Sequence, residues 1–463
     1  MEEKQKIINR KNFSSDSRLL KKGEIFFDLE SKDNQDSKYL GDAIKKKPLL
    51  IISQNKNHIS TKNFYIVKNI KSFFENKVNQ KFNKKPKYKV AVTGTNGKSS
   101  VAYYYYTILR LLKYNVASIG TLGIFENRKK KNIHLTTPSF LDNHKIFNSF
   151  YKKKINHCII EASSHGLKQS RLKFIKFHCG IFTNLTRDHL DYHKTMKDYF
   201  NSKLILLKKL IKKKGFVIFS TDIKEFDVLK KISIKKNLNI LSYGFKGNVI
   251  KIISTKIINQ KTKLKINVLG KIYVIMLNLV GTIQIQNLLC AILALYSCGI
   301  SFNKIFSSCS KIYNPPGRMQ IVKNKKKIVI IDYAHTPDAL QKTINEAKSF
   351  FNKKANLVFG CGGDRDKGKR GIMGKIANKL CKKIYITDDN PRYENPAYIR
   401  NEIKKNCSKG LIIPSRKKAI QKAISDLKDE VLIIAGKGHE NYQIFKNKKI
   451  NFSDYKFANI YSN

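Results

Sequence analysis

Short apolar runs alternate with segments of helical periodicity along most of the chain. The run Val90–Val92, for example, is followed by apolar residues at Val101, Tyr105, Ile108 and Leu112, three or four positions apart. A short apolar run bounded by turn residues is typical of a buried strand, and this spacing is typical of one face of a helix. The repeated alternation predicts a mostly parallel sheet covered by helices, which is an α/β fold.

The pattern of strands and helices predicts three domains, which are residues 1–87, 88–314 and 315–463. The last domain begins at the break Pro315-Pro316-Gly317, and its glycine-rich loops give it a Rossmann-like pattern without the G-x-G-x-x-G of a dehydrogenase. The strands expected are Glu24–Asp28, Pro48–Ile52 and Phe64–Val67 in the first domain, Val116–Ile119, His157–Glu161, Cys179–Thr183 and Phe216–Ser220 in the middle domain, and Ile328–Ile331, Asn356–Phe359, Lys383–Thr387 and Val431–Ile434 in the last.

The segment Ile272–Asn303 contains no charged residue and has to be weighed as a membrane span. Gly281 and Gln284 interrupt it, together with Gln286 and Asn287. The longest apolar run left is about nine residues, far short of the roughly 20 that a span needs. The segment therefore predicts a buried strand followed by a core helix, with no stable membrane insertion.

The net charge of +59 would ordinarily indicate a nucleic-acid partner or an anionic membrane surface. However, 80 lysines stand against 12 arginines, tryptophan is absent, and the lysines are spread over the whole chain. This composition is typical of AT-rich codon usage rather than of a binding stripe with interleaved arginine and aromatic residues. Runs such as Lys129–Lys131 and Lys323–Lys327 are expected to be solvated. No nucleic-acid partner is expected, and a basic nucleic-acid-binding ATPase is kept as an alternative.

The eight cysteines are scattered, with no C-x-x-C pair and no metal-ligand spacing. Reduced thiols in a cytoplasm are the simplest interpretation. The first residues are charged throughout, which does not fit a signal peptide. We expect a cytoplasmic monomer.

The stretch Val90–Ser100, VAVTGTNGKSS, predicts a strand, a glycine loop and the start of a helix. The loop amides and the helix N-terminus favour an anion, Lys98 supplies a charge to the outer phosphates, and the Ser99 hydroxyl can ligate magnesium. ATP or GTP is therefore expected; the alternative is a turn without a ligand. The loop departs from the common G-x-x-x-x-G-K-[ST], because Val92 stands where the first glycine would be.

T-G-T-N-G-K-[ST] resembles the phosphate loop of the Mur ligases and folylpolyglutamate synthetases, which join an amino acid to a carboxylate through an acyl phosphate. Further motifs follow in the order found in the UDP-N-acetylmuramoyl-tripeptide synthetase branch of the Mur ligases. They are TTP at Thr136, E-x-SSHGL-x-Q-x-R at Glu161, FTNL-x-RDHLDYH at Phe182, PPGRMQ at Pro315, DYAHTPDAL at Asp332, GCGGDRDKGKR at Gly360, DDNPR at Asp388 and GKGHE at Gly436. D-S-R at Asp16 resembles that family's uridine-binding segment.

The chain departs from the family pattern at a few positions. Leu135 precedes the threonine pair where the family usually has asparagine, and Gln284 stands where a first asparagine is frequent, although Asn287 is present. The region after Asp28 is short and rich in lysine, so contacts to uridine there stay unassigned.

The resemblance implies a three-domain ligase with a central ATP-binding domain and a Rossmann-like last domain. Its reaction would be the ATP-dependent addition of meso-diaminopimelate to UDP-N-acetylmuramoyl-L-alanyl-D-glutamate in peptidoglycan synthesis. The alternatives are the homologue that adds L-lysine, a folylpolyglutamate synthetase, and a scaffold without catalysis. ATP, two Mg²⁺ ions and carbon dioxide for a carbamylated lysine are the cofactors that it implies.

The same resemblance assigns roles to residues. The catalytic residues would be Lys98, Glu161, His189 and Lys203. The ATP-binding residues would be Gly94, Thr95, Asn96, Gly97, Lys98, Ser99, Ser100, Asn287, Arg318 and Asp332. The metal ligands would be Ser99, Glu161, His189 and Lys203 as its carbamate. The uridine-nucleotide substrate would contact Ser17, Thr136, Thr137, Ser163, Gln169 and Arg171. Diaminopimelate would contact Arg365, Asp389, Asn390, Pro391, Arg392, Gly436 and Glu440.

Two of these assignments have competing interpretations. Met196–Lys213 is expected to be a helix, and Lys203 flanks its apolar stripe, so it could instead be a lysine whose amine reaches solvent. His189 and His193 share the H-x-x-x-H spacing of a zinc site, but no glutamate base lies between them, and a structural role is expected for His193.

Arg392 follows a proline that stiffens its loop, and its planar fork suits the second carboxylate of diaminopimelate. The alternative is a solvated arginine in a surface turn.

Overall fold

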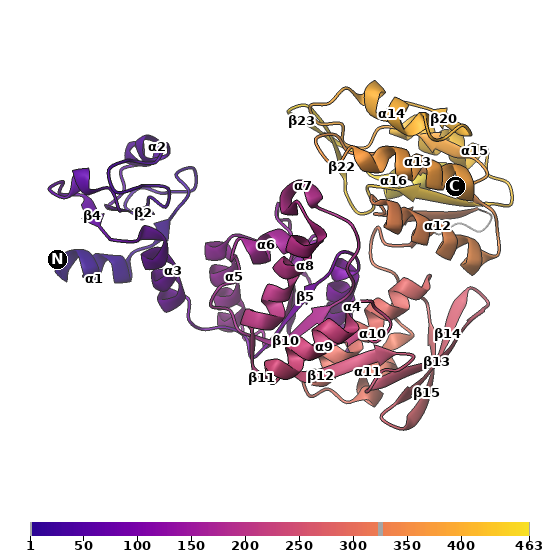
Figure 1. Ribbon diagram of the computed structural model, residues 1–463, viewed down its shortest axis with the longest axis horizontal. Coiled ribbons are helices and arrows are strands. Elements are labelled where there is room, and N and C mark those ends of the chain that lie inside the picture. The colour runs from indigo at the N-terminus through magenta and orange to yellow at the C-terminus, as the bar shows by residue number, and fades with distance from the viewer. Residues whose placement is uncertain (1, 323–326, 463) are drawn as a thin grey trace. The chain divides into compact units, whose positions relative to one another are not determined.

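The computed structural model describes residues 2–322 and 327–462 (Figure 1). These residues form two compact units. The first holds the residues up to Lys85 together with Leu141–Lys153, and the second holds Pro86–Phe140 and the residues from Lys154 on. Parallel sheets with helices between their strands occur in both units, which confirms the predicted α/β fold.

The first unit contains a four-stranded parallel sheet in the order β1-β2-β3-β4. Phe13, Phe27 and Phe74 form its aromatic core, with ring centroids 5.3 Å apart for Phe13 and Phe27 and 5.0 Å apart for Phe27 and Phe74. The three predicted strands are confirmed. The elements are α1 (Glu2–Arg10), β1 (Phe13–Ser14), β2 (Ile25–Phe27), α2 (Leu40–Lys45), β3 (Leu50–Ser53), a 3-10 turn (Lys56–His58), β4 (Phe64–Ile66), α3 (Ile70–Lys81) and most of α5 (Phe140–Lys152).

The second unit begins with an eleven-stranded sheet in the order β15-β14-β13-β12-β11-β10-β5-β9-β6-β7-β8. Its centre is parallel, as predicted, and antiparallel strands extend both ends. The strands are β5 (Tyr88–Thr93), β6 (Val116–Gly120), β7 (Gly123–Glu126), β8 (Lys129–Lys131), β9 (His157–Glu161), β10 (Phe177–Phe182), β11 (Ile211–Ser220), β12 (Asn239–Gly244), β13 (Ile250–Ile258), β14 (Lys261–Val268) and β15 (Lys271–Leu277). The basic run Lys129–Lys131 is exposed, in β8.

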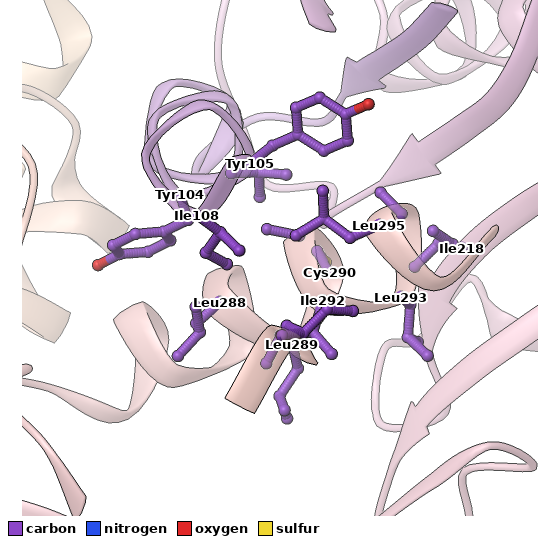
Figure 2. Close-up of a cluster of buried hydrophobic side chains, with 14 of the residues drawn as sticks. Tyr104, Tyr105, Ile108, Ile218, Leu288, Leu289, Cys290, Ile292, Leu293 and Leu295 are labelled. Atoms are coloured by element: carbon purple, nitrogen blue, oxygen red, sulfur yellow. The ribbon is translucent and has the colours of Figure 1, made fainter. Parts of the chain in front are cut away.

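The helices of this part are α4 (Lys98–Leu111), α6 (Ser164–Lys168), α7 (Leu190–His193), α8 (Met196–Ile205), α9 (Phe226–Lys235), α10 (Thr282–Ser297) and α11 (Phe302–Cys309). Figure 2 shows Tyr104 and Ile108 of α4 beside Leu288 of α10, in a cluster of buried apolar side chains. Each leucine buried there contributes about 1.5–3 kcal/mol. The cluster fixes α4, and with it the loop before α4, on the sheet.

The prediction for Ile272–Asn303 is half right. The core helix is confirmed as α10, but the strand before it, β15, is not buried, since Ile272 and Val274 are 55% and 54% exposed. The buried and exposed residues of β15 alternate, with Ile275 and Leu277 buried and Ile272, Val274 and Met276 exposed, so only one of its faces is covered. Among the described residues, no helix is long and apolar enough to cross a membrane.

The prediction of one helix over Met196–Lys213 is wrong at its end. The α-helix stops at Ile205, a π-helical turn covers Leu206–Leu210, and Ile211 already pairs with Phe177 in the sheet. Ile211 is β-branched and suits a strand, and its pairing in the sheet outweighs the helical spacing of the apolar residues before it. Lys212 and Lys213 therefore lie in β11.

The last part of the unit has a six-stranded sheet in the order β16-β17-β21-β18-β19-β20, parallel except for β16. Apolar clusters cover both faces. Of the basic run Lys323–Lys327, only Lys327 lies within the described residues. The elements are β16 (Gln320–Val322), β17 (Ile328–Asp332), α12 (Pro337–Phe351), β18 (Ala355–Phe359), α13 (Gly368–Leu380), β19 (Ile384–Ile386), α14 (Pro396–Lys404), β20 (Gly410–Ile412), α15 (Arg416–Ser425), β21 (Val431–Ala435), β22 (Tyr442–Phe445), β23 (Lys448–Asn451) and α16 (Asp454–Ser462).

Candidate active site

The loop between β5 and α4 has the geometry of a phosphate cradle. Gly94 and Gly97 have φ angles of 144° and 90°, which favour glycine. A Cβ at Gly94 would lie 1.9 Å from Oγ1 of Thr183, and one at Gly97 would lie 2.3 Å from Oδ1 of Asn287. Glycine is therefore required at both positions, because the turn needs these φ angles and because neighbouring side chains leave no space for a Cβ.

A second segment, Thr183–Thr186, holds this loop in shape. The amide of Asn96 donates to Oδ1 of Asn184 at 2.9 Å, and Oγ1 of Thr183 donates to the carbonyl of Asn96 at 2.6 Å. Neither Thr183 nor Asn184 is among the site residues predicted from the sequence. Their position directly after a predicted strand, inside the FTNL motif, was the available signal.

Lys98 and Lys203 converge on the loop backbone. The amine of Lys98 donates to the carbonyls of Gly94 and Thr95, both at 2.8 Å, and the amine of Lys203 donates to that of Gly94 at 2.8 Å. Lys203 is 1% exposed, and its amine lies 4.2 Å from the ring centre of Tyr199. Burial, and then the charge of Lys98, lowers the pKa of Lys203 well below its ordinary value. The interpretation of Lys203 as a lysine that reaches solvent is wrong.

Ser99 and Glu161 lie side by side at the start of α4 and the end of β9. Oγ of Ser99 donates to Oε2 of Glu161 at 2.9 Å, and the amide of Thr121 donates to Oε1 of Glu161 at 2.8 Å. A hydroxyl next to a carboxylate is the hard-oxygen donor set that Mg²⁺ prefers. Arg318 approaches from the last part of the chain, with Nη2 3.5 Å from Oγ of Ser99.

A cavity of about 720 Å³ surrounds these groups. Its walls include Arg318, Asp332 and Asn287. Burial raises the pKa of Asp332, although Arg318 opposes the shift, and the carboxylate accepts from the amides of Met319 at 2.7 Å and Ala334 at 2.8 Å. Nine of the ten predicted ATP-binding residues line the cavity; they are Thr95, Asn96, Gly97, Lys98, Ser99, Ser100, Asn287, Arg318 and Asp332.

The two histidines of the H-x-x-x-H pair lie in different surroundings. His189 has a φ of 54° and faces the cavity, with Nε2 3.5 Å from a carboxylate oxygen of Asp188. Desolvation lowers the pKa of His189, although Asp188 opposes the shift. His193 is buried, and its ring nitrogens lie 3.0 Å and 3.3 Å from the hydroxyls of Ser164 and Ser202. These partners support the structural role expected for His193 rather than a zinc site.

The residues predicted for the uridine-nucleotide substrate form a connected chain in the second unit, apart from Ser17. Oγ1 of Thr137 donates to the carbonyl of Glu161 at 2.7 Å, and Arg171 donates to the carbonyl of Thr137 at 2.8 Å. Oγ of Ser163 caps α6. The other contacts of this chain link Thr136 to Thr121, Arg171 to Gln169, and Gln169 to Tyr192. Ser17 belongs to the first unit, where it is buried.

A second cavity, of about 430 Å³, holds six of the seven residues predicted to contact the amino acid. They are Arg365, Asp389, Asn390, Arg392, Gly436 and Glu440. Pro391 is buried, and its carbonyl accepts from the amide of Glu394. The first and second cavities share four lining residues, which are Asp188, His189, Tyr333 and His335. The two cavities therefore meet beside His189.

Arg392 is half-buried and has a φ of 52°. Its Nη1 donates to the carbonyl of Gly363 at 2.6 Å, and its backbone amide donates to the carbonyl of Ile444 at 3.1 Å. These bonds hold the guanidinium against the loop after β18, where Arg392 lines the second cavity. The geometry supports a fixed cation rather than a freely solvated arginine.

Lys437, the second residue of the GKGHE motif, is not among the site residues predicted from the sequence. It is 0% exposed, and its amine donates to Oδ1 of Asn390 at 2.9 Å and to Oε2 of Glu440 at 3.0 Å. Nδ2 of Asn390 also donates to Glu440, at 3.1 Å. Lys437 thus joins two residues that line the second cavity.

Comparison with known protein families gives two matches. A model of the Mur ligase middle domain matches residues 92–295, and a model of the Mur ligase glutamate ligase domain matches residues 317–438.

Individual proteins give the same result. The UDP-N-acetylmuramoyl-L-alanyl-D-glutamate--2,6-diaminopimelate ligase of Rickettsia rickettsii is 37% identical over 456 residues, which are 96% of this chain and 94% of that protein. A solved structure of a ligase with the same name has a TM-score of 0.68 and 27% identity, over 97% of this chain and 94% of its own. A Mycobacterium tuberculosis folylpolyglutamate synthase, complexed with ADP and AMPPCP, has a TM-score of 0.66 and 16% identity, over 79% of this chain and 91% of its own.

Proposed function

Because this chain belongs to the Mur ligase family, we propose that it joins meso-diaminopimelate to UDP-N-acetylmuramoyl-L-alanyl-D-glutamate in peptidoglycan synthesis, with ATP as the source of energy. The γ-carboxylate of the D-glutamate would be phosphorylated, and an amine of diaminopimelate would displace the phosphate to form an amide. The products are the tripeptide nucleotide, ADP and inorganic phosphate.

One observation carries this proposal. The cavity around the phosphate loop and the cavity around Arg392 meet at Asp188 and His189. A carboxylate at this junction would lie between the nucleotide's outer phosphate and the incoming amine, which are the two partners of the reaction. Holding them together converts a reaction between separate molecules into one within a complex.

The phosphate side of the junction is built for negative charge. Lys98 would turn from the carbonyls of Gly94 and Thr95 to the outer phosphates, and Arg318 would neutralise charge from the opposite wall. Asn287 and Asp332 would bind the rest of the nucleotide. The hydroxyl of Ser99 and the carboxylate of Glu161 would hold one Mg²⁺, and His189 would contribute to a second. Bound there, Mg²⁺ supplies Lewis-acid stabilisation of the phosphate oxygens.

Lys203 fits the role of a carbamylated lysine. Its lowered pKa favours the neutral amine, which is the form that attacks carbon dioxide. The neutral amine would bond to the carbon of carbon dioxide and lose a proton, which places a carbamate anion next to Lys98. The described residues contain no group of three or more His, Cys, Asp and Glu side chains that could hold a metal. A carbamate at Lys203 would add the missing oxygen ligand.

The two substrates would be recognised by the remaining predicted residues. Thr136, Thr137, Ser163, Gln169 and Arg171 would bind the peptide end of the uridine nucleotide, and Ser17 would bind its uridine end. Arg392, with Arg365, would pair with the far carboxylate of diaminopimelate, in the loop that Pro391 stiffens. Asp389, Asn390, Gly436 and Glu440 would read its other polar groups.

The alternatives predict different acceptors or amines. A folylpolyglutamate synthetase would use a folate, but the similarity to such an enzyme extends over 79% of this chain against 97% for the diaminopimelate ligase structure. In a homologue that adds L-lysine, the cation of Arg392 would have no carboxylate of the amino acid to pair with.

We further propose domains at 1–87, 88–314 and 315–463, a cytoplasmic location, a monomer and no nucleic-acid partner.

Release of ADP is the direct test. The purified chain is supplied with ATP, Mg²⁺, the uridine dipeptide nucleotide and one amino acid at a time. We expect ADP to form in step with tripeptide nucleotide when meso-diaminopimelate is present, and little ADP with L-lysine or when folate replaces the nucleotide. Equal turnover with folate and glutamate would contradict the proposal.

A further inference from the structure

β13, β14 and β15 form an antiparallel edge of the eleven-stranded sheet, labelled together in Figure 1. The inner face of β15 is covered, since the ring centre of Tyr273 lies 4.8 Å from that of Phe306 in α11. The outer face is not. Ile272, Val274 and Met276 are 55%, 54% and 38% exposed and form an apolar row.

A row of lysines runs beside this apolar row. In the register of β14 and β15, Lys265 stands opposite Val274 and Lys263 opposite Met276. Lys256 of β13 continues the basic surface, opposite Lys263. All three lysines are exposed. We call the apolar row and these lysines the β15 face.

Local acidic residues do not neutralise the β15 face. After Asp227 the sequence has no acidic residue before Asp332, although acidic residues make up 33 of the 463 in the chain. None of the described lysines in this interval forms an ion pair, whereas elsewhere in the same unit Lys168 pairs with Asp198 at 2.6 Å. The charge of this segment is therefore concentrated, beyond the general excess of lysine.

The edge itself is open. Within residues 2–322 and 327–462, β15 pairs only with β14, and in an antiparallel pair alternate residues of an edge strand direct their N–H and C=O groups outward. An extended segment could add there as a further strand. Its apolar side chains would pack beside Ile272, Val274 and Met276. Its carboxylates would lie two strands, about 10 Å, from the lysines of β14, which is about one Debye length at physiological salt.

We propose that the β15 face is a docking site for an extended, acidic segment of a partner protein, which adds to the sheet beside β15. A second copy that added through its own β15 would place its β14 lysines three strands, about 14 Å, from these lysines, and would bring positive charge and no carboxylates. Duplex DNA is disfavoured because it would not cover the apolar row of β15, and because the segment between Arg187 and Arg318 contains no arginine for bidentate pairing with phosphates. A bilayer would leave the outward backbone groups of β15 without partners.

The test uses a fluorescent peptide in which valine and glutamate alternate over the length of β15. Its binding to the full chain is followed by fluorescence anisotropy at physiological salt. We expect an isomer with all valines before all glutamates, and a peptide N-methylated at alternate residues, to bind at least about tenfold more weakly. Equal binding of the N-methylated peptide would overturn strand addition.

Variants of the chain locate the site. Val274→Ser and the pair Lys263→Gln with Lys265→Gln should each weaken binding by about three- to tenfold, without change in thermal unfolding. The matched controls, on α9, are Val228→Ser and the pair Lys230→Gln with Lys231→Gln, which replace exposed residues and should change binding less than about twofold.

Three outcomes would reject the proposal. Equal losses in the α9 controls would mean that charge alone binds the peptide. If the wild-type chain sediments as a dimer and Val274→Ser dissociates that dimer, a second copy of the chain would be the occupant of the β15 face. Duplex DNA or anionic phosphatidylglycerol vesicles that bind more tightly than the peptide, through the same residues, would replace the partner protein.

Discussion

The amines of Lys98 and Lys203 donate to one acceptor, the carbonyl oxygen of Gly94, each at 2.8 Å. Two positive charges so close together in a buried site repel each other strongly. Burial and this repulsion lower the pKa of Lys203 well below its ordinary value. The neutral amine that results has a chemical and an energetic consequence, and each can be measured.

The chemical consequence is carbamylation. We expect ¹³C-labelled bicarbonate to give a carbamate NMR signal with the wild-type chain that is lost in Lys203→Met. Lys203→Met should lose at least about a hundredfold in turnover while its affinity for ATP stays within about twofold, because the loss falls on transition-state charge. Lys208→Met, at an exposed position on the following turn, is the control. A retained signal in Lys203→Met would assign the carbamate elsewhere.

The energetic consequence is a cost in stability. Between the lowered pKa of Lys203 and its ordinary value, the unfolded chain binds more protons than the folded chain, so stability falls as the pH falls through this window. Methionine at this position removes that cost. In bicarbonate-free buffer at neutral pH, Lys203→Met should gain about 1–3 kcal/mol in the free energy of unfolding. The gain should shrink toward pH 10, and a gain that is constant with pH would rule out titration as its cause.

The sequence predicted the strands well where a short apolar run is buried on both sides. β9, His157–Glu161, has the predicted bounds, and its five residues are all buried. The prediction from the sequence failed where a residue far away in the chain determines the local structure. The pairing of Ile211 with Phe177 ends a helix that the local spacing continues, and the apolar residues of β15 do not reveal that one face lacks a cover.

The candidate site could be predicted because its residues occur in contiguous motifs of known order. Lys437 was missed because its neighbours Gly436 and Gly438 suggest only a turn, and nothing local indicates that this lysine is buried. Its burial depends on Asn390, from a loop 47 residues earlier. The separation into two cavities that meet at His189 likewise depends on residues far apart in the sequence, since Asp188 and His189 line both cavities together with Tyr333 and His335.

His157 should make stability depend on pH. It is buried beside Tyr88, with ring centres 4.8 Å apart, and burial lowers its pKa to about 4. The unfolded chain, with an ordinary histidine, takes up this proton first as the pH falls, so stability is complete above about pH 6.5 and is lost toward pH 4, by about 3 kcal/mol.

Urea unfolding at pH 7 and pH 4.5 measures this loss. His157→Phe should reduce the difference between the two pH values, whereas His134→Gln, at an exposed position, should leave it unchanged. An equal difference in wild type and His157→Phe would assign the pH dependence to other groups.

Lys437→Met should weaken the amino-acid site without affecting the nucleotide site. It removes the cation shared by Asn390 and Glu440, and a half-buried carboxylate that loses its partner costs about 1–3 kcal/mol. We expect KM for diaminopimelate to rise at least about tenfold, with KM for ATP unchanged. Lys437→Met should also lower the free energy of unfolding, and the double variant Lys437→Met with Glu440→Gln should recover this stability but not the affinity for the amino acid. Recovery of both would show that Lys437 serves folding alone.

Arg392 should decide between meso-diaminopimelate and L-lysine, which differ by one carboxylate. Nη1 of Arg392 is held by the carbonyl of Gly363, so the guanidinium is fixed before the amino acid binds. L-lysine would leave this cation without its anion, which costs several kcal/mol. We therefore expect the wild type to prefer diaminopimelate by at least about a hundredfold in kcat/KM.

Substitution separates the charge of Arg392 from its shape. Arg392→Lys keeps the charge but loses the planar fork that pairs with a carboxylate through two hydrogen bonds. It should lose about tenfold or more in kcat/KM for diaminopimelate, and Arg392→Ala should lose most of the preference. Neither change should raise KM for ATP, because Arg392 lines the second cavity and not the first. Equal use of both amino acids by the wild type would assign the selection of the amine to other residues, and the proposed substrate would then be wrong.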